Sequence, residues 1–220
     1  MYIVLLGAPG SGKGTQAEKI RDFYKIPHIS TGDIFRQEIK KDPQGAKQIA
    51  DLINIGHLAP DEIVIKLVKD RLLQDDCKSG ALLDGFPRTI SQAESMDEYS
   101  LVFKQKVVVI NLSVPRELLI RRVLGRRVCV DCSKNYSFDS YASLDELAQK
   151  LCDCGGKLYN REDDNADIFK TRLEVYDEWT AHLIEYYSNS GNLIIIDGSE
   201  DTEIVFENIK AELAKLKKND

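Results

Sequence analysis

A glycine-rich stretch near the N-terminus carries the strongest chemical signal in the sequence. Residues 7–15 read GAPGSGKGT, after the apolar run 3–6 and before a helical pattern. Such a turn points backbone N–H groups at one centre, and the helix N-terminus adds partial positive charge. We therefore predict a phosphate cradle, with Lys13 reaching the outer phosphates. Gly14 separates Lys13 from Thr15, which makes Thr15 the candidate hydroxyl on the Mg²⁺ side; a turn without ligand is the alternative.

A carboxylate is predicted beside this cradle. Residues 81–84 read as a buried strand that ends in Asp84, and ligands of open parallel sheets bind beyond the carboxyl ends of the strands. Mg²⁺ keeps most of its waters when a protein binds it. Asp84 is therefore expected to hold Mg²⁺ through its water shell, whereas the alternative role is to cap the turn at Gly85.

Arginines scattered along the chain are candidates for stabilising a transferring phosphoryl group, whose negative charge spreads over several oxygens. Arg122 and Arg126 would share a helix face if the helix continued through Gly125. Arg161 precedes a helix start expected around residues 163–164, and Arg172 follows about three turns later. Each could be a surface residue when taken alone. The candidates are Arg36, Arg88, Arg122, Arg126, Arg161 and Arg172.

Four of the five cysteines are bunched in one region, whereas Cys77 stands apart as an expected packed thiol. The odd total and the absence of a secretion signal argue against a disulfide framework and favour a metal. The three histidines lie in separate segments, and no chemistry is assigned to them. The bunched cysteines are Cys129, Cys132, Cys152 and Cys154.

Strands alternate with helices along the chain, which predicts an α/β fold with a parallel sheet covered on both faces. Residues 125–164 break this pattern and read as an inserted subdomain, with a short helix near 144–149. Strands are expected at 3–6, 28–29, 81–84, 107–112 and 192–197. Helices are expected at 13–24, 34–41, 44–53, 63–73, from 90, at 115–124, from about 164 and at 202–217.

Composition limits the possible partners. The chain has 220 residues, 43% of them hydrophobic, and a formal net charge of −6, which disfavours nonspecific nucleic-acid binding. Neither a signal peptide nor an apolar stretch of about 20 residues is recognisable. We therefore expect a cytoplasmic protein without nucleic-acid or membrane partners, built as one domain with insertions or as two small domains.

Taken together, these motifs resemble adenylate kinase, in its long-lid bacterial form, over essentially the whole chain. The resemblance rests on residues 7–15, Thr31-Gly32-Asp33 with Arg36, residues 84–88 with Gln92, Gly125-Arg126-Arg127, and Arg161 with Asp163, Asp164 and Arg172. It implies a three-layer P-loop fold with a core domain (1–29, 60–124 and 163–220), a helical AMP-binding flap (30–59) and a lid (125–162). It also implies a monomer that catalyses ATP + AMP ⇌ 2 ADP with Mg²⁺ and so balances the adenine nucleotides.

The resemblance also assigns roles to individual positions. The implied catalytic residues are Lys13, Arg88, Arg126, Arg161 and Arg172. ATP would contact Gly10, Ser11, Gly12, Lys13, Gly14, Thr15, Arg122, Arg126, Asn135 and Tyr136. AMP would contact Thr31, Arg36, His57, Leu58, Ala59, Gly85, Phe86, Pro87, Arg88, Gln92, Arg161 and Arg172, and Mg²⁺ would be held through water by Thr15 and Asp84. The Gln92 carboxamide suits adenine because it offers both a donor and an acceptor.

The cysteines resemble the zinc-bearing lid of some adenylate kinases, with one departure. Four thiolates suit tetrahedral Zn²⁺ in a structural site. The family has two residues between its last two ligands, whereas here only Asp153 separates Cys152 from Cys154. Cys154 could still bind with an adjusted backbone, Asp153 could replace it, the site could be weakened, or the four thiols could hold no metal.

Three other functions compete with this interpretation. The nearest is another nucleoside monophosphate kinase, acting on UMP or CMP or transferring from GTP to AMP. A GTPase-type switch would need an Asn-Lys-x-Asp stretch, which the sequence lacks. A zinc-ribbon nucleic-acid binder is suggested by the cysteines alone and opposed by the acidic balance.

Overall fold

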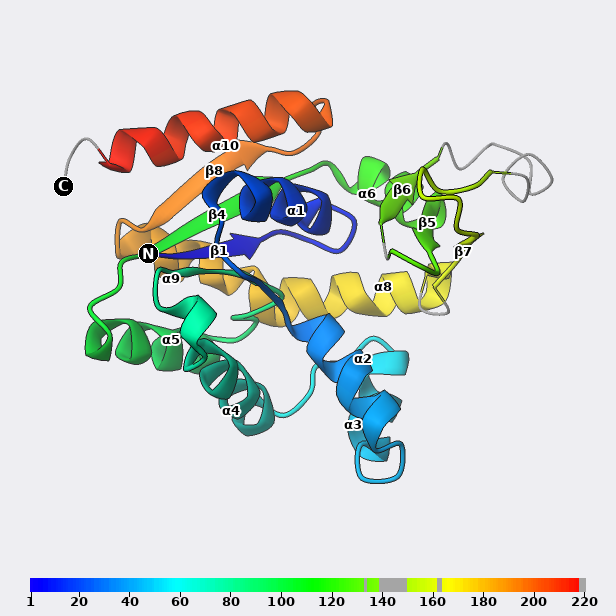
Figure 1. The fold of residues 1–220 in the computed structure, drawn as a ribbon, viewed down its shortest axis with the longest axis horizontal. Helices are drawn as coiled ribbons and strands as arrows, with labels where there is room; N and C mark the ends of the chain where they lie inside the picture. Colours follow the sequence, from blue (N-terminus) through cyan, green and yellow to red (C-terminus); the bar gives the residue numbers. More distant parts are fainter. Residues whose placement is uncertain (133, 139–149, 162–163, 218–220) are drawn as a thin grey trace.

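A parallel β-sheet forms the centre of the molecule. The computed structural model describes residues 1–132, 134–138, 150–161 and 164–217 (Figure 1). The sheet that it describes has the strand order β2-β3-β1-β4-β8, and all the neighbouring strands are parallel. The predicted α/β class is confirmed. The strands are β1 (Tyr2–Leu6), β2 (His28–Ser30), β3 (Ala81–Asp84), β4 (Val107–Ser113) and β8 (Leu193–Asp197).

Strand β1 is buried on both faces, and its side chains alternate between two hydrophobic cores. Tyr2, Val4 and Leu6 belong to one core, and Ile3 and Leu5 belong to the other. Successive side chains of a strand point to opposite faces, and a sheet covered on both sides needs apolar residues on both. This arrangement explains why the strand is a continuous apolar run.

Helices cover the sheet on both faces (Figure 1). The core around Ile3 and Leu5 is closed by α1 (Lys13–Tyr24) and α10 (Thr202–Lys217). The opposite core is closed by α4 (Asp61–Leu72), α5 (Ile90–Val102) and α9 (His182–Asn189), and η1 (Asp75–Cys77) places its buried cysteine there. Cys77 is thus a packed thiol, as expected.

Two further groups of elements project from this core (Figure 1). Helices α2 (Thr31–Lys41) and α3 (Lys47–Asn54) connect β2 to α4. The Ser30 side chain caps α2 by accepting a hydrogen bond from the Asp33 amide, as its position before the helix predicts. A small antiparallel sheet of order β6-β5-β7 follows α6 (Arg116–Leu124). Its strands are β5 (Arg126–Cys129), β6 (Asn135–Ser137) and β7 (Leu158–Tyr159).

The chain returns from the small sheet through α8 (Ala166–Val175), which continues into the π-helical turn η2 (Tyr176–Thr180) and then α9. The N-cap of α8 is Asn165, whose side chain accepts a hydrogen bond from the Ile168 amide. The helix therefore starts one or two residues later than the position expected around residues 163–164. The helix expected at 44–53 corresponds to α3 (Lys47–Asn54), and the helix expected at 63–73 corresponds to α4 (Asp61–Leu72). The helix expected near 144–149 lies outside the described residues. No helix in the described part of the chain has the length and apolar character needed to cross a membrane.

Candidate active site

The glycine-rich loop connects the central strand β1 to α1. Gly10 and Gly12 adopt positive φ values of 85° and 95°, which an L side chain rarely tolerates. Residues that alternate between left- and right-handed conformations turn successive N–H groups toward one point and form an anion-binding nest. Gly12 is also the N-cap of α1, and the first turn of that helix contains no acidic residue. The loop is therefore prepared for a phosphate group.

Lys13, the first residue of α1, folds back over this loop. Its Nζ donates to the carbonyls of Gly7 at 2.7 Å and Ala8 at 3.1 Å. Burial lowers the pKa of Lys13 to about 8; Asp84 opposes this shift, and Arg88, Arg126 and Arg172 add to it. An anion that entered the loop would restore the preference of Lys13 for its charged form.

Ser11 supports the phosphate interpretation from a second direction. Its hydroxyl is buried, and among the described residues it has no hydrogen-bond partner. An unpaired buried hydroxyl costs free energy. Phosphate oxygens in the loop are strong acceptors that fit this donor.

Asp84 ends β3 beside the glycine-rich loop, as predicted. It pairs in register with Leu5 of β1, two residues before Gly7. Burial opposes its ionisation, but the neighbouring His28 and the charge of Lys13 outweigh burial and hold the pKa of Asp84 below its usual value. The His28 Nε2 lies 3.6 Å from Asp84 Oδ2. Asp84 and Thr15 both line the cleft, and a carboxylate and a hydroxyl suit Mg²⁺, which prefers oxygen ligands.

A second part of the site is built where α2 meets the turn after β3. Thr31 Oγ1 donates to the Gly85 carbonyl at 3.0 Å, and Arg88 Nε donates to the same oxygen at 3.0 Å. Arg36 forms an ion pair with Asp33 on the same helix. The Arg88 carbonyl accepts from Thr180 Oγ1 of η2 at 3.0 Å. These contacts join α2, the 85–88 turn and η2 around one arginine.

Gln92 is buried at the start of α5, and hydrogen bonds to both ends of its carboxamide fix the orientation of that group. Its Oε1 accepts from the Arg88 amide at 2.8 Å, and its Nε2 donates to Asp61 Oδ1 at 2.7 Å. Asp61 Oδ2 accepts from Thr89 Oγ1 at 2.7 Å. Thr89 in turn caps α5 by accepting from the Gln92 amide.

Arg122 and Arg126 do not share a helix face, because α6 ends at Leu124 and Arg126 begins β5. Arg122 donates to the Gly198 carbonyl at 2.8 Å and so joins α6 to the loop after β8. Arg126 makes a two-pronged ion pair with the buried Asp164, including Nε to Oδ2 at 2.6 Å. The two arginines reach the site from different elements instead.

Arg161 and Arg172 complete the cationic set. Arg161 donates to Asn135 Oδ1 of β6 at 3.4 Å. Arg172 lies on α8, about two turns after the helix start, with its side chain packed against Gly56. Both residues come from the segment that returns the chain from the small sheet to the core.

The glycine-rich loop, Lys13, Asp84, Gln92 and the six candidate arginines line one cleft of about 580 Å³. Of the predicted nucleotide and Mg²⁺ residues, Phe86 alone is absent from its wall, because its side chain packs in the core. Sequence reasoning missed other lining residues: His28 on β2, and Gly198, Glu200 and Thr202 after β8. The loop after β8 follows the carboxyl end of a parallel strand, and that position could have identified it.

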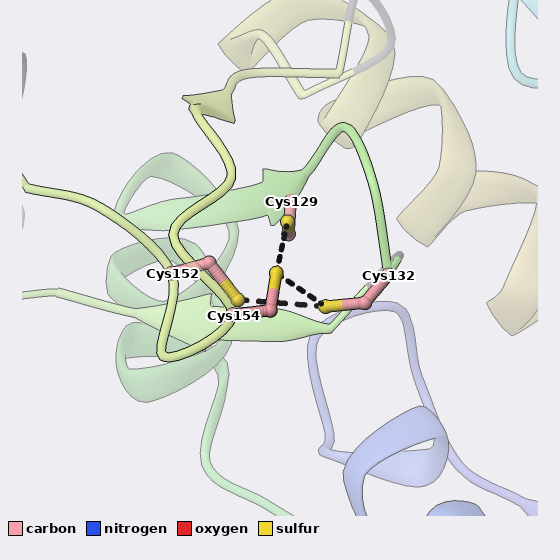
Figure 2. Close-up of side chains that lie close together, drawn as sticks. All are labelled: Cys129, Cys132, Cys152 and Cys154. Carbon is pink, nitrogen blue, oxygen red and sulfur yellow. Dashed lines mark hydrogen bonds between the residues drawn. The ribbon is translucent and has the colours of Figure 1, made fainter.

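The four clustered cysteines meet at one point in the small sheet and its loops (Figure 2). Their sulfurs all lie within 4.8 Å of one another. The contacts are 3.6 Å between Cys129 and Cys154, 3.4 Å between Cys132 and Cys152, and 3.6 Å between Cys132 and Cys154. Asp153 points elsewhere, since Lys134 Nζ binds its Oδ2 at 2.5 Å. Four thiols so arranged can surround a tetrahedral ion.

Comparison with known proteins gives consistent matches over the chain. A family model described as "Adenylate kinase" matches residues 5–192. The chain is 46% identical to the adenylate kinase of Clostridium tetani, over 98% of this chain and 100% of that protein. It is 48% identical to the adenylate kinase of Caldicellulosiruptor saccharolyticus, over 91% and 93% of the two chains. The adenylate kinase of Methanosarcina mazei is 43% identical over 98% of this chain and 100% of its own length.

Proposed function

The chain belongs to the adenylate kinase family, and we propose that the residues lining its cleft carry out the family's reaction in the roles described below. Adenylate kinases transfer a phosphoryl group from ATP to AMP and yield two ADP, with Mg²⁺ bound to ATP. The observation that best supports these roles is that cations from separate segments line one cleft together with the glycine-rich loop.

The donor nucleotide is proposed to lie with its phosphates in the glycine-rich loop. Lys13 would leave the Gly7 and Ala8 carbonyls to bind the outer phosphates, and Ser11 would donate its unpaired hydroxyl. Arg122 would border the adenosine, near the loop after β8 that it already binds. The remaining proposed donor contacts are Gly10, Gly12, Gly14, Thr15, Arg126, Asn135 and Tyr136.

The acceptor is proposed to lie on the opposite side of the cleft. Arg36 and Arg88 would bind the AMP phosphate, and Gln92 would read the base. Contacts with residues 57–59, Gly85, Pro87 and Thr31 would complete this pocket. An AMP phosphate oxygen attacks the γ-phosphorus, a new P–O bond forms, and the bond to the bridging oxygen breaks with ADP as leaving group. The attacking oxygen is already anionic, so no side chain has to remove a proton.

Arg88, Arg126, Arg161 and Arg172 are proposed to stabilise the transferring group. Phosphoryl transfer depends chiefly on positioning and on cations that face the developing charge. Mg²⁺, held through water by Asp84 and Thr15, would supply further positive charge at the phosphates. Arg126 would exchange its Asp164 partner for phosphate oxygens when the lid (residues 125–162) closes.

We also propose that Cys129, Cys132, Cys152 and Cys154 bind a structural Zn²⁺. Zn–S bonds of about 2.3 Å in a tetrahedron require sulfurs about 3.8 Å apart, close to the contacts of 3.4–3.6 Å. The Lys134–Asp153 pair favours Cys154 over Asp153 as fourth ligand. Four protein ligands leave no open position, so the ion would hold the lid together without entering the chemistry.

An assay of acceptors and donors tests the function. ADP formation is followed with ATP or GTP as donor and AMP, UMP, CMP or GMP as acceptor. ATP with AMP is expected to be the preferred pair, and ATP is expected to be stable when no acceptor is added. Preference for UMP or CMP would replace the proposal with another monophosphate kinase. We further propose a cytoplasmic monomer without nucleic-acid partners; the net charge of −6 supports the absence of nucleic-acid partners.

A further inference from the structure

The orientation of the Gln92 carboxamide is decided by two partners that cannot change roles. A backbone amide such as that of Arg88 can only donate, and an ionised carboxylate such as Asp61 can only accept. The first binds the oxygen of Gln92 at 2.8 Å and the second binds its nitrogen at 2.7 Å. Rotating the carboxamide by half a turn would place donor against donor and acceptor against acceptor.

Half of the carboxamide's hydrogen-bonding capacity is left over for a ligand. A carboxamide has two donor hydrogens and two acceptor lone pairs, and the Arg88 amide and Asp61 use one of each. Gln92 belongs to the wall of the cleft although it is 1% exposed. One acceptor position on Oε1 and one donor hydrogen on Nε2 are therefore available to a nucleotide base, in a fixed order.

This order matches adenine and opposes hypoxanthine. Adenine offers a donor at its 6-amino group and an acceptor at N1, whereas hypoxanthine offers an acceptor at O6 and a donor at N1. Hypoxanthine would pair only with the rotated carboxamide. A site built to hydrogen-bond one pattern rejects the reversed one because buried polar groups are left unpaired.

We propose that Asp61 is a positioning residue that sets the base selectivity of the acceptor site by locking the Gln92 carboxamide. The proposal rests on the proposed function, in which Gln92 reads the base of AMP. Asp61 is the first residue of α4 and reaches α5 by two hydrogen bonds, to Thr89 and Gln92. Its effect on the substrate is exerted through Gln92.

The substitution Asp61→Asn tests the proposal with little change in shape. An asparagine amide can either accept from or donate to Gln92, so the Arg88 amide alone then opposes the rotated carboxamide. The ratio of kcat/KM for AMP to that for IMP is expected to fall about tenfold or more, chiefly because IMP becomes a better substrate. KM for ATP should stay within about twofold of the wild-type value.

Two further variants separate this role from a structural one. Glu62→Gln removes the neighbouring charge on the same helix, where Glu62 is exposed, and should leave the AMP-to-IMP ratio unchanged. In a Gln92→Ala background, Asp61→Asn should no longer alter the ratio, because residues that act through one another are not additive. An unchanged ratio in Asp61→Asn alone, or a parallel loss of AMP and IMP activity, would overturn the proposal.

A measurement on the unaltered protein avoids dependence on a variant that folds poorly. One Gln92 side-chain amide proton should resist solvent exchange without nucleotide, as seen by NMR with assignment from Gln92→Ala. The second should become protected with AMP and stay unprotected with IMP. Free exchange of both protons would contradict the lock. Failure of the wild-type protein to phosphorylate AMP would instead contradict the proposed function.

Discussion

Arg88 is the residue at which we expect recognition of the acceptor to meet the chemistry. Its amide binds Gln92, its carbonyl binds Thr180, and its Nε binds the Gly85 carbonyl. Three elements therefore hold the backbone and the base of the side chain, which leaves the rest of the guanidinium to face a phosphate. A preorganised cation of this kind has no reorganisation cost at the moment of transfer.

Replacing Arg88 by alanine should lower kcat by about 10³ or more, by analogy with arginine fingers. Arg88→Lys should recover little, because lysine keeps the charge and loses the planar fork. Steady-state ADP formation measures both effects. Arg116→Ala, which breaks an exposed ion pair with Asp177, is the matched control and should keep near-normal turnover. Near-normal turnover of Arg88→Ala would remove Arg88 from the mechanism.

The lowered pKa of Lys13 should make ATP binding pH-dependent. Its pKa is about 8 in the free protein, and a bound phosphate chain should raise it. The affinity for ATP should therefore be at its maximum below about pH 8, where Lys13 is charged in the free protein, and should weaken as the pH rises above that value. At pH 9, binding should take up about 0.8 of a proton per ATP, by linkage. Calorimetry in buffers of different ionisation enthalpy measures this uptake, and Lys13→Arg, which keeps its charge, should abolish it.

The glycine-rich loop depends on close approach to its neighbouring helix. A Cβ atom at Gly10 would lie 2.9 Å from the Leu119 carbonyl oxygen and 2.8 Å from Val123 Cγ2, both on α6. Gly10→Ala should therefore reduce the free energy of unfolding by about 1–3 kcal/mol and raise KM for ATP. Gly14 lies inside α1 with no atom within 4 Å of its would-be Cβ. Denaturant titration should show Gly14→Ala to be no less stable than the wild type.

The proposed lid (residues 125–162) is expected to depend on the proposed zinc site for its stability. Protein purified without chelator should contain about one zinc per chain, and removing the metal should lower the unfolding temperature. Cys154→Ala should lose the zinc, whereas Asp153→Asn should keep it. Metal analysis and thermal unfolding of the two variants decide between Cys154 and Asp153. Equal zinc loss in both would contradict the assignment, and far less than one zinc in the wild type would end the proposal.

At the scale of the whole molecule, the two projecting groups of elements lie on either side of one cleft. A kinase that assembled its cations without an acceptor would transfer phosphate to water, and we expect closure over both nucleotides to prevent this. Small-angle scattering should show a smaller radius of gyration with an analogue that joins two adenosines through a polyphosphate chain. ATP alone or AMP alone should give a smaller decrease. An unchanged radius with the joined analogue would contradict closure.

Much of the fold was predictable because its signals are local. The apolar run of β1, the glycines after it and the caps at Ser30 and Thr89 depend on neighbours a few residues away. Local signals located boundaries less well. The end of α6 at Leu124 agrees with the expected 115–124, whereas α4 begins at Asp61 instead of residue 63 and the return helix starts after Asn165.

The order of glycines, lysine and carboxylate along the sequence by itself determined that this protein handles phosphates, because a strand, a tight turn and a helix N-terminus are consecutive in the chain. The pattern of apolar segments along the sequence likewise determined the alternation of strands and helices. Only the tertiary structure decided which charges meet. Asp61 reaches Gln92 across 31 residues, and Arg126 reaches Asp164 across 38. Such pairs depend on how separate elements pack, and no short-range pattern encodes that arrangement.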